Sequence, residues 1–212
     1  MKHVDVKLMH GNKSGDFFGK ATLSSYWTIL KDNINALSVS NGAFFEDLSN
    51  TSTQLSFPIK INGNTLTTGA SNDFPNERKM LVFKDTCANG YKCALVMNYS
   101  TSILNSSSYS NIIVGLSPYA DKSSSFPLGR TFIGVDHSNT GTPILYIVHG
   151  TNATQSQMRE VMYDLNIYDD AIVMLDGSGS SQLAFGNTKV YGSRGTGPDY
   201  RKIPQVIVVI KK

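Results

Sequence analysis

Short runs of strand-forming residues recur along almost the whole chain, and this pattern restricts the fold more than any other feature of the sequence. Each run is rich in Val, Ile, Leu or Phe and is bounded by Gly, Pro, Asn or Asp, as expected for β-strands joined by turns. In the first run, Val4, Val6 and Leu8 alternate with other residues. The others span residues 80–83, 94–97, 111–115, 130–136, 143–149, 171–175 and 205–210. The pattern predicts a fold built mainly from strands.

Two segments instead show the apolar spacing of an amphipathic helix. The first spans residues 23–37 after Thr22, an expected N-cap, and the second begins at a capping box made by Thr154 and Gln157. Their apolar faces consist of Leu23, Tyr26, Trp27, Leu30, Ile34 and Leu37 in the first and Met158, Val161, Met162 and Leu165 in the second. The serine-rich residues 98–111 are expected to form a surface loop or a weakly paired edge strand. Together these elements predict an α+β fold, a single domain over residues 1–212 with two main helices on a large mixed or antiparallel sheet.

Composition excludes several classes of partner. The net charge is only +3, and Lys and Arg are scattered rather than gathered into the basic, aromatic-interleaved patch of a nucleic-acid groove. The longest apolar runs are too short to cross a bilayer, and residues 1–20 lack the apolar region of a secretory signal. We therefore expect neither a nucleic-acid polymer nor a membrane as partner, while compartment and oligomeric state stay open.

Cysteine and histidine spacing gives no sign of a metal site or a cofactor. Cys87 and Cys93 flank an Asn-Gly turn and form either a small hairpin disulfide or two free thiols.

The stretch AIVMLDGSGSSQLAF, residues 171–185, contains the first candidate site. Asp176 ends a buried strand, so rigid structure holds it while its side chain can still face a cleft. Gly177 and Gly179 allow close approach of a ligand to the backbone, and Ser180 and Ser181 add hydroxyl groups beside an expected anion-binding nest. The alternative is a tight turn between two strands, since Asp-Gly is a strong hairpin signal.

A similar arrangement follows the first helix. There a strand leads into NGAFFED, residues 41–47, just as the second helix and its strand lead into the loop at Asp176. In each case a polar residue and a glycine stand at the carboxyl end of a strand. We expect the two loops to form one site.

Four motifs resemble those of the phosphodiester glycosidase family. DGSGSS (176–181) is similar to the family's Asp-Gly-Gly-Gly-Ser-Ser signature, and NALSVSNGAFF (35–45) to its Ala-x-x-x-x-Asn-Gly-Gly-Phe-Phe. GRTFIGVD (129–136) resembles its Arg-Thr-x-x-Gly strand, and YRKIPQVIVV (200–209) its closing Arg and last strand. The elements follow in order over residues 1–210. Ala43 and Ser178 depart from the family pattern, because each replaces a glycine.

The resemblance implies hydrolysis of the anomeric bond of a sugar-1-phosphodiester, in a glycan, a cell-wall polymer or a nucleotide-like conjugate. The leaving phosphomonoester is a weak base, so a fixed cation and a carboxylate matter more than a strong general acid. We expect Asp176 to be the main carboxylate, with Glu46 as a second. Arg130 is the expected cation, because a guanidinium binds two phosphate oxygens at once. Its alternative is a surface arginine paired with a carboxylate.

Further residues are expected to bind substrate or to assist. Arg201 and Arg194 are additional cations, and His149 ends a strand from which it reaches the same cleft. The remaining expected contacts to sugar or phosphate are Asn41, Gly42, Phe44, Gly177, Gly179, Ser180 and Ser181.

Two other functions stay open at this level. One is a non-catalytic module that binds a glycan or a sugar phosphate, for example in a phage particle or a cell-surface assembly. The other is an ordinary glycosidase, which two carboxylates facing each other across the cleft would favour over a lone carboxylate beside arginines.

Overall fold

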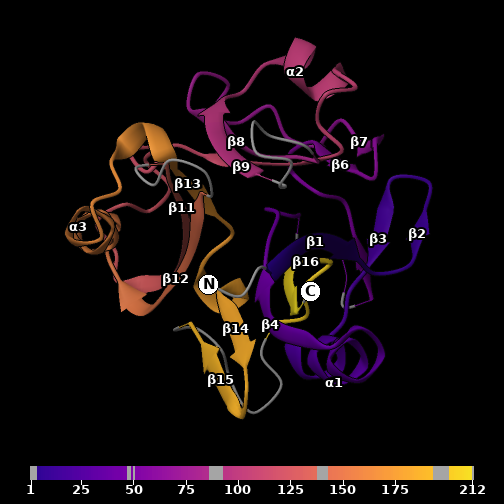
Figure 1. Ribbon diagram of the computed structural model, residues 1–212. Coiled ribbons are helices and arrows are strands. Elements are labelled where there is room, and N and C mark those ends of the chain that lie inside the picture. Colours follow the sequence, from indigo (N-terminus) through magenta and orange to yellow (C-terminus); the bar gives the residue numbers. More distant parts are fainter. Residues whose placement is uncertain are drawn as a thin grey trace.

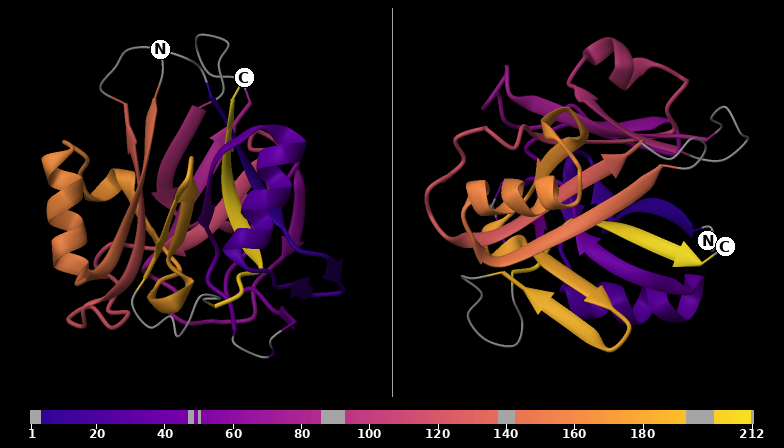
Figure 2. Two further views of the ribbon diagram at one scale, coloured as in Figure 1. Left: turned by 90° about the horizontal axis from the view of Figure 1, so that it is seen from below. Right: turned by 60° about the vertical axis from the view of Figure 1, so that its left-hand side comes forward.

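The structure, a computed structural model, describes residues 4–46, 49, 51–85, 93–137, 143–192 and 201–211. It confirms the α+β class: three α-helices accompany three sheets, and every strand pairing in the described residues is antiparallel. Figure 2 shows α1 and α3 on opposite outer sides, with the two larger sheets between them. Among the described helices, none has the length and apolar character that crossing a membrane requires.

The five-stranded sheet carries α1 (Leu23–Ile34) on one face (Figure 1). Its strands, in spatial order, are β1 (Val4–His10), β16 (Gln205–Lys211), β4 (Ala36–Asn41), β14 (Gln182–Phe185) and β15 (Thr188–Tyr191). Leu23, Tyr26, Trp27 and Leu30 of the helix are buried in one cluster with Val39, Val206 and Val208 of the sheet. This packing fixes the end of β4 from which residues 41–46 continue.

The eight-stranded sheet carries α3 (Gln155–Asp164). A path of six strands runs through β12 (Ile144–Ala153), β11 (Leu128–Asp136), β13 (Ile172–Leu175), β10 (Asn111–Leu116), β6 (Ile59–Ile61) and β7 (Asn64–Thr67). In addition, β8 (Arg78–Lys84) pairs with β10 and with β9 (Cys93–Asn98). The third sheet contains only β2 (Lys13–Ser14), β3 (Phe17–Gly19) and β5 (Ser52–Thr53).

Both predicted helices form, and their caps are as expected. The Thr22 hydroxyl accepts a hydrogen bond from Ser25 N–H at 3.1 Å, and Thr154 and Gln157 make a capping box. The first helix ends earlier than predicted, because Asn35 adopts a left-handed conformation with φ 54°. Leu37 therefore lies in β4 and is 43% exposed, so its assignment to the helix face was wrong. Val161 is likewise exposed on α3 rather than buried.

All the predicted strands form, but residues 98–111 differ from the expected loop or edge strand. They contain a short helix, α2 (Thr101–Asn105), whose Leu104 is buried. The buried Lys60 ammonium donates to the carbonyls of Leu104 and Ser106 at 3.2 and 2.6 Å, which satisfies the end of this helix. Cys93 is disulfide-bonded, whereas Cys87 lies outside the described residues.

The chain passes from one of the larger sheets to the other through residues 176–181, the Asp loop. β13 belongs to the eight-stranded sheet and β14 to the five-stranded sheet, so residues 176–181 connect them. The short helical turn η2 (Ser178–Ser180) lies within this connection, and another, η1 (Asp169–Ala171), precedes β13. The candidate site therefore lies at the seam between the sheets.

Candidate active site

A pocket of about 280 Å³ opens beside the Asp loop. It is lined by Phe44, Phe45, Glu46, Ser56, Phe57, Ser71, Asp73, Lys122, Ser123, Leu128, Arg130, Met174, Leu175, Asp176, Gly177, Ser178 and Arg201. The predicted residues in this lining are Asp176, Gly177, Arg130, Glu46, Phe44 and Arg201. Those outside it are Asn41, Gly42, His149, Gly179, Ser180 and Ser181. Arg194 lies outside the described residues.

Asp176 lines the pocket together with the carboxylates Glu46 and Asp73, and its chemistry is set by its surroundings. Burial raises the pKa of Asp176 to about 6, against the opposing effects of the Ser180 hydroxyl, Arg201, the Gly177 N–H and Lys122. The Gly177 N–H donates to Oδ1 at 2.9 Å. A carboxyl group with this pKa holds or releases a proton close to neutral pH, as a general acid or base requires.

Asn41, which the sequence predicted as a contact to sugar or phosphate, joins the two predicted loops. Its amide Nδ2 donates to the carbonyl of Asp176 at 2.7 Å, and Asp176 N–H donates to the carbonyl of Gly42 at 3.2 Å. Asn41 Oδ1 accepts from the Thr131 hydroxyl at 2.8 Å and from Gln182 N–H at 3.0 Å. The Asn41 side chain thus links β4, β11 and both ends of the Asp loop, and it does so from behind the pocket wall.

Donors of the Asp loop are largely used within the loop and on the neighbouring strand β11. The N–H groups of Ser180 and Ser181 donate to the carbonyls of Gly177 and Ser178, both at 3.1 Å. Ser181 Oγ donates to the carbonyl of Arg130 at 2.8 Å. The N–H groups of Ser180 and Ser181 therefore do not point into the pocket as anion donors. The expected anion-binding nest has fewer available N–H groups than predicted.

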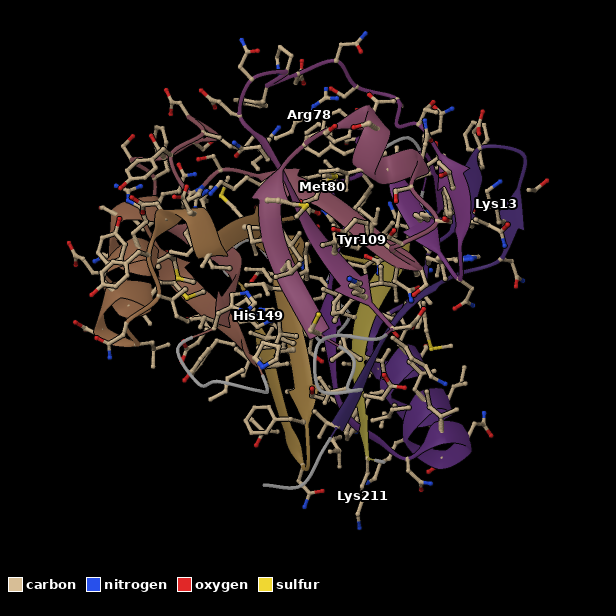
Figure 3. All side chains as sticks on the ribbon, turned by 45° about the horizontal axis from the view of Figure 1, so that its top comes forward. Lys13, Arg78, Met80, Tyr109, His149 and Lys211 are labelled. Carbon is tan, nitrogen blue, oxygen red and sulfur yellow. The ribbon has the colours of Figure 1, made fainter. Side chains whose placement is uncertain are left out.

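His149, labelled in Figure 3, belongs to β12, and its ring lies among three hydroxyl groups. Its Nε2 lies 3.0 Å from Ser40 Oγ, and its Nδ1 lies 3.1 Å from Ser181 Oγ and 3.3 Å from Thr131 Oγ1. Burial lowers the pKa of His149 to about 3, so the ring is neutral at physiological pH. The neutral imidazole supports Ser181 and the Asp loop from behind.

Arg130 is buried, with only 4% of its surface exposed, and its guanidinium faces main-chain carbonyls. Nη1 donates to Lys122 at 3.0 Å, and Nη2 donates to Ser123 and, at 3.0 Å, to Phe126. Nε donates to Ala153 at 3.3 Å. Four of the five N–H groups of the guanidinium therefore hold the loop at residues 122–126 and the end of β12.

The other lining residues supply charge and apolar surface. Arg201 Nη1 lies 3.5 Å from Ser180 Oγ, which places this cation beside the Asp loop. Glu46 Oε1 accepts from the Ser56 hydroxyl at 2.8 Å. Phe44 is buried and packs edge-to-face on Phe57, with ring centroids 5.5 Å apart.

Several residues of the site carried no recognisable signal. Lys122 and Asp73 line the pocket from polar loops without a motif. Gln205 lies within the motif at 200–209, but its contact, accepting from Ala43 N–H at 2.8 Å, was not predicted. Gln182 directly follows the Asp loop and donates through Nε2 to the carbonyls of Gly179 and Arg201, at 3.0 and 2.6 Å. Its position next to the motif was the one clue available.

The sequence profile of the phosphodiester glycosidase family matches residues 15–210. The chain belongs to the phosphodiester glycosidase family. No curated protein sequence matches it.

Solved structures share the fold at low sequence identity. The catalytic domain of zebrafish N-acetylglucosamine-1-phosphodiester alpha-N-acetylglucosaminidase, auto-inhibited by its pro-peptide, superposes with a TM-score of 0.67 at 16% identity. That match covers 98% of this chain and 73% of the zebrafish chain. A hypothetical protein from Synechocystis gives a TM-score of 0.58 at 13% identity, over 99% of this chain and 57% of that one.

The two departures from the family's glycine pattern occupy different environments. Ala43 is buried in the core at 3% exposure, and its methyl group is accommodated there. Ser178 has a φ of +57°, in the left-handed region that favours glycine. By contrast, Gly42 matches the family pattern, and a Cβ there would lie 1.7 Å from Gln205 Oε1, so the Gln205 side chain would have to move.

Proposed function

We propose that this protein hydrolyses the anomeric bond of a sugar-1-phosphodiester in a glycan, a cell-wall polymer or a nucleotide-like conjugate. The observation that carries the proposal is the composition of one pocket: Asp176, with its raised pKa, lies among the cations Lys122, Arg130 and Arg201. Membership of the phosphodiester glycosidase family supports it. We also propose that residues 1–212 form one domain of this family.

In this mechanism water adds to the anomeric carbon, and the bond between that carbon and the phosphate oxygen breaks. The electron pair stays on the departing phosphomonoester, whose negative charge the cations stabilise. Asp176 in its ionised form takes the proton from water or stabilises the positive charge that develops on the sugar ring. Glu46 is the second carboxylate, on the same pocket wall as Phe44.

The remaining predicted residues support the pocket in our proposal. Asn41, Gly42 and the segment Gly179–Ser181 hold Asp176 in place, and the neutral His149 holds Ser181. Arg130 contributes positive charge at the wall while its N–H groups hold the neighbouring loop. Arg201 contributes a second positive charge beside Asp176.

The test is release of free N-acetylglucosamine or glucose from a small panel of sugar-1-phosphodiesters. Asp176→Asn keeps the shape of the side chain, and we expect it to lower the rate by roughly 10²- to 10⁴-fold, the usual contribution of a positioned proton-transfer group. Lys31→Met on α1, outside the pocket, is the matched surface control. Unchanged turnover in Asp176→Asn would refute the role given to this residue.

A binding module without turnover is the alternative within the same pocket. Binding of a sugar phosphate by the unaltered protein, with no release of sugar from any diester across pH 4–9, would establish it. Neither the family match nor the similar solved structures support a place in a phage particle.

Hydrolysis of an uncharged glycoside is a second candidate reaction, because Glu46 and Asp176 line the same pocket. Neutral aryl glycosides therefore belong in the substrate panel. Faster release from these than from the phosphodiesters would favour the ordinary glycosidase.

A further inference from the structure

Two arginines organise the pocket wall that faces the Asp loop, and both do so through main-chain carbonyls. Arg130 holds the carbonyls of Lys122, Ser123 and Phe126. Arg78, labelled in Figure 3, donates from Nη2 to the carbonyls of Ser71 and Asp73, at 2.9 and 2.8 Å. Residues of both loops line the pocket. The arginine charges thus serve mainly to fix the backbone from which other side chains reach the pocket.

Lys122 is the cation that the Arg130-anchored loop presents to the pocket. Its ammonium lies 5.6 Å from the ring centroid of Phe74, which belongs to the loop that Arg78 holds. Within the described ranges, this ammonium donates no hydrogen bond. Its three N–H groups are therefore available to an acceptor that enters the pocket.

The charge of Lys122 acts on the reacting carboxylate. Lys122 and Arg201 both lower the pKa of Asp176 against the larger effect of burial, so both cations lie within electrostatic range of it. Arg130 is different, since four of its five N–H groups already bind carbonyls. A phosphate group beside Asp176 would therefore find more unused donors on Lys122 than on Arg130.

We propose that Lys122 binds the phosphate group of the substrate, together with Arg201, and thereby makes the pocket select charged phosphodiesters over neutral glycosides. This inference rests on the proposed function. A lysine ammonium is a compact charge on a flexible stem, and it can exchange the Phe74 ring for a phosphate oxygen with little movement of the backbone. Arg130 is then a positioning residue, because it acts through the loop that carries Lys122.

Binding of product-like fragments tests this role without relying on turnover. Phenyl phosphate probes the phosphate position and N-acetylglucosamine the sugar position, each titrated by NMR at low ionic strength. We expect Lys122→Met to weaken phenyl phosphate binding about tenfold, as for the loss of one charge-assisted hydrogen bond, and to leave N-acetylglucosamine binding unchanged. Lys122→Arg should recover most of the loss.

Lys31→Met is the matched control for charge and setting. Lys31 is also an exposed lysine over an aromatic ring, 5.8 Å from the centroid of Trp27, but it lies on α1 outside this pocket. We expect this variant to bind phenyl phosphate like the unaltered protein. Equal binding by Lys122→Met and Lys31→Met would overturn the role of Lys122, and so would an unaltered protein that does not bind phenyl phosphate.

A second readout follows the carboxyl carbon of Asp176 by NMR across pH. The charged groups that line the pocket with it are Glu46, Asp73, Lys122, Arg130 and Arg201. Loss of the Lys122 charge should raise the pKa of Asp176, whereas Lys31→Met should not change it. An unchanged pKa in Lys122→Met would place the ammonium too far from the reacting centre for the proposed role.

The substrate panel separates this inference from the proposed function. A fall in release from phosphodiesters in Lys122→Met that exceeds any fall in release from neutral glycosides supports both. Release that is equal in Lys122→Met and the unaltered protein overturns the inference and leaves the proposed function standing. An unaltered protein that binds phenyl phosphate through Lys122 but releases no sugar contradicts the proposed function alone.

Discussion

Asp176→Asn should make the protein more stable at neutral pH while lowering its activity. Burial of the carboxyl group raises its pKa from 3.8 to about 6 in the folded state. At about 1.4 kcal/mol per tenfold change, this rise corresponds to about 3 kcal/mol by which ionisation of Asp176 destabilises the folded state. Asparagine is not ionised, but it forms weaker hydrogen bonds with Gly177 N–H and the Ser180 hydroxyl. We expect a net gain of about 2 kcal/mol.

The gain should depend on pH with a defined sign. Well below pH 3.8, Asp176 is protonated in the folded and the unfolded chain, and the two proteins should be about equally stable. As pH rises from 4 through 6, the unfolded chain releases its proton first, so the unaltered protein loses stability relative to Asp176→Asn. Above pH 7 the difference should stay constant.

Urea denaturation of both proteins at pH 4, 6 and 8 measures this difference, and titrations of other groups largely cancel in the comparison. In a thermal scan at pH 8, a gain of about 2 kcal/mol corresponds to a rise in Tm of roughly 4–8 °C for a chain of this size. A variant that is less stable at pH 8, or a difference that is the same at pH 4 and pH 8, would refute the reasoning.

Three further outcomes follow from the site. The His149 ring, with a pKa of about 3, should stay neutral from pH 5 to 8 in an NMR titration, and a midpoint near pH 6 would contradict its burial among hydroxyl groups. Ser178→Gly should raise the free energy of unfolding in urea by about 0.5–1 kcal/mol, because Ser178 has a positive φ. A lower free energy of unfolding would show that the serine side chain makes a compensating contact. Arg130→Gln should cost about 3 kcal/mol, since several carbonyls lose their donors. Arg159→Gln should cost about 1 kcal/mol, because Arg159 donates to the Pro118 carbonyl and lies over the Tyr119 ring; equal losses in urea denaturation would contradict this.

Local signals explain which parts of the fold were predictable. Thr22, Thr154 and Gln157 cap helices whose first turns lie within three residues of them, so their effect can be read from adjacent sequence. The end of α1 was misplaced because Leu37 continues the apolar spacing, while the left-handed Asn35 stops the helix before it. The short helix α2 was missed because part of its support comes from Lys60, a distant residue.

In the candidate site, the proximity of the two motif loops could be predicted, but the partners of individual side chains could not. Asp176 and Asn41 follow strands and carry family motifs, and the structure places them in direct contact at 2.7 Å. The partners of Arg130 could not be predicted, because every residue has a carbonyl and only the path of the backbone decides which ones face the guanidinium. Lys122 was missed for a related reason, since its position depends on that same path.

Anchoring by carbonyls also affects how this family member can diverge. Arg130 and Arg78 hold groups that all amino acids share, so residues 122–126 and 71–73 can change in sequence while their backbone stays attached. The part of the pocket that these two loops line is therefore open to variation in sequence. Randomising the sequence of these two loops should therefore yield variants with new substrate preferences in which the position of Asp176 is kept.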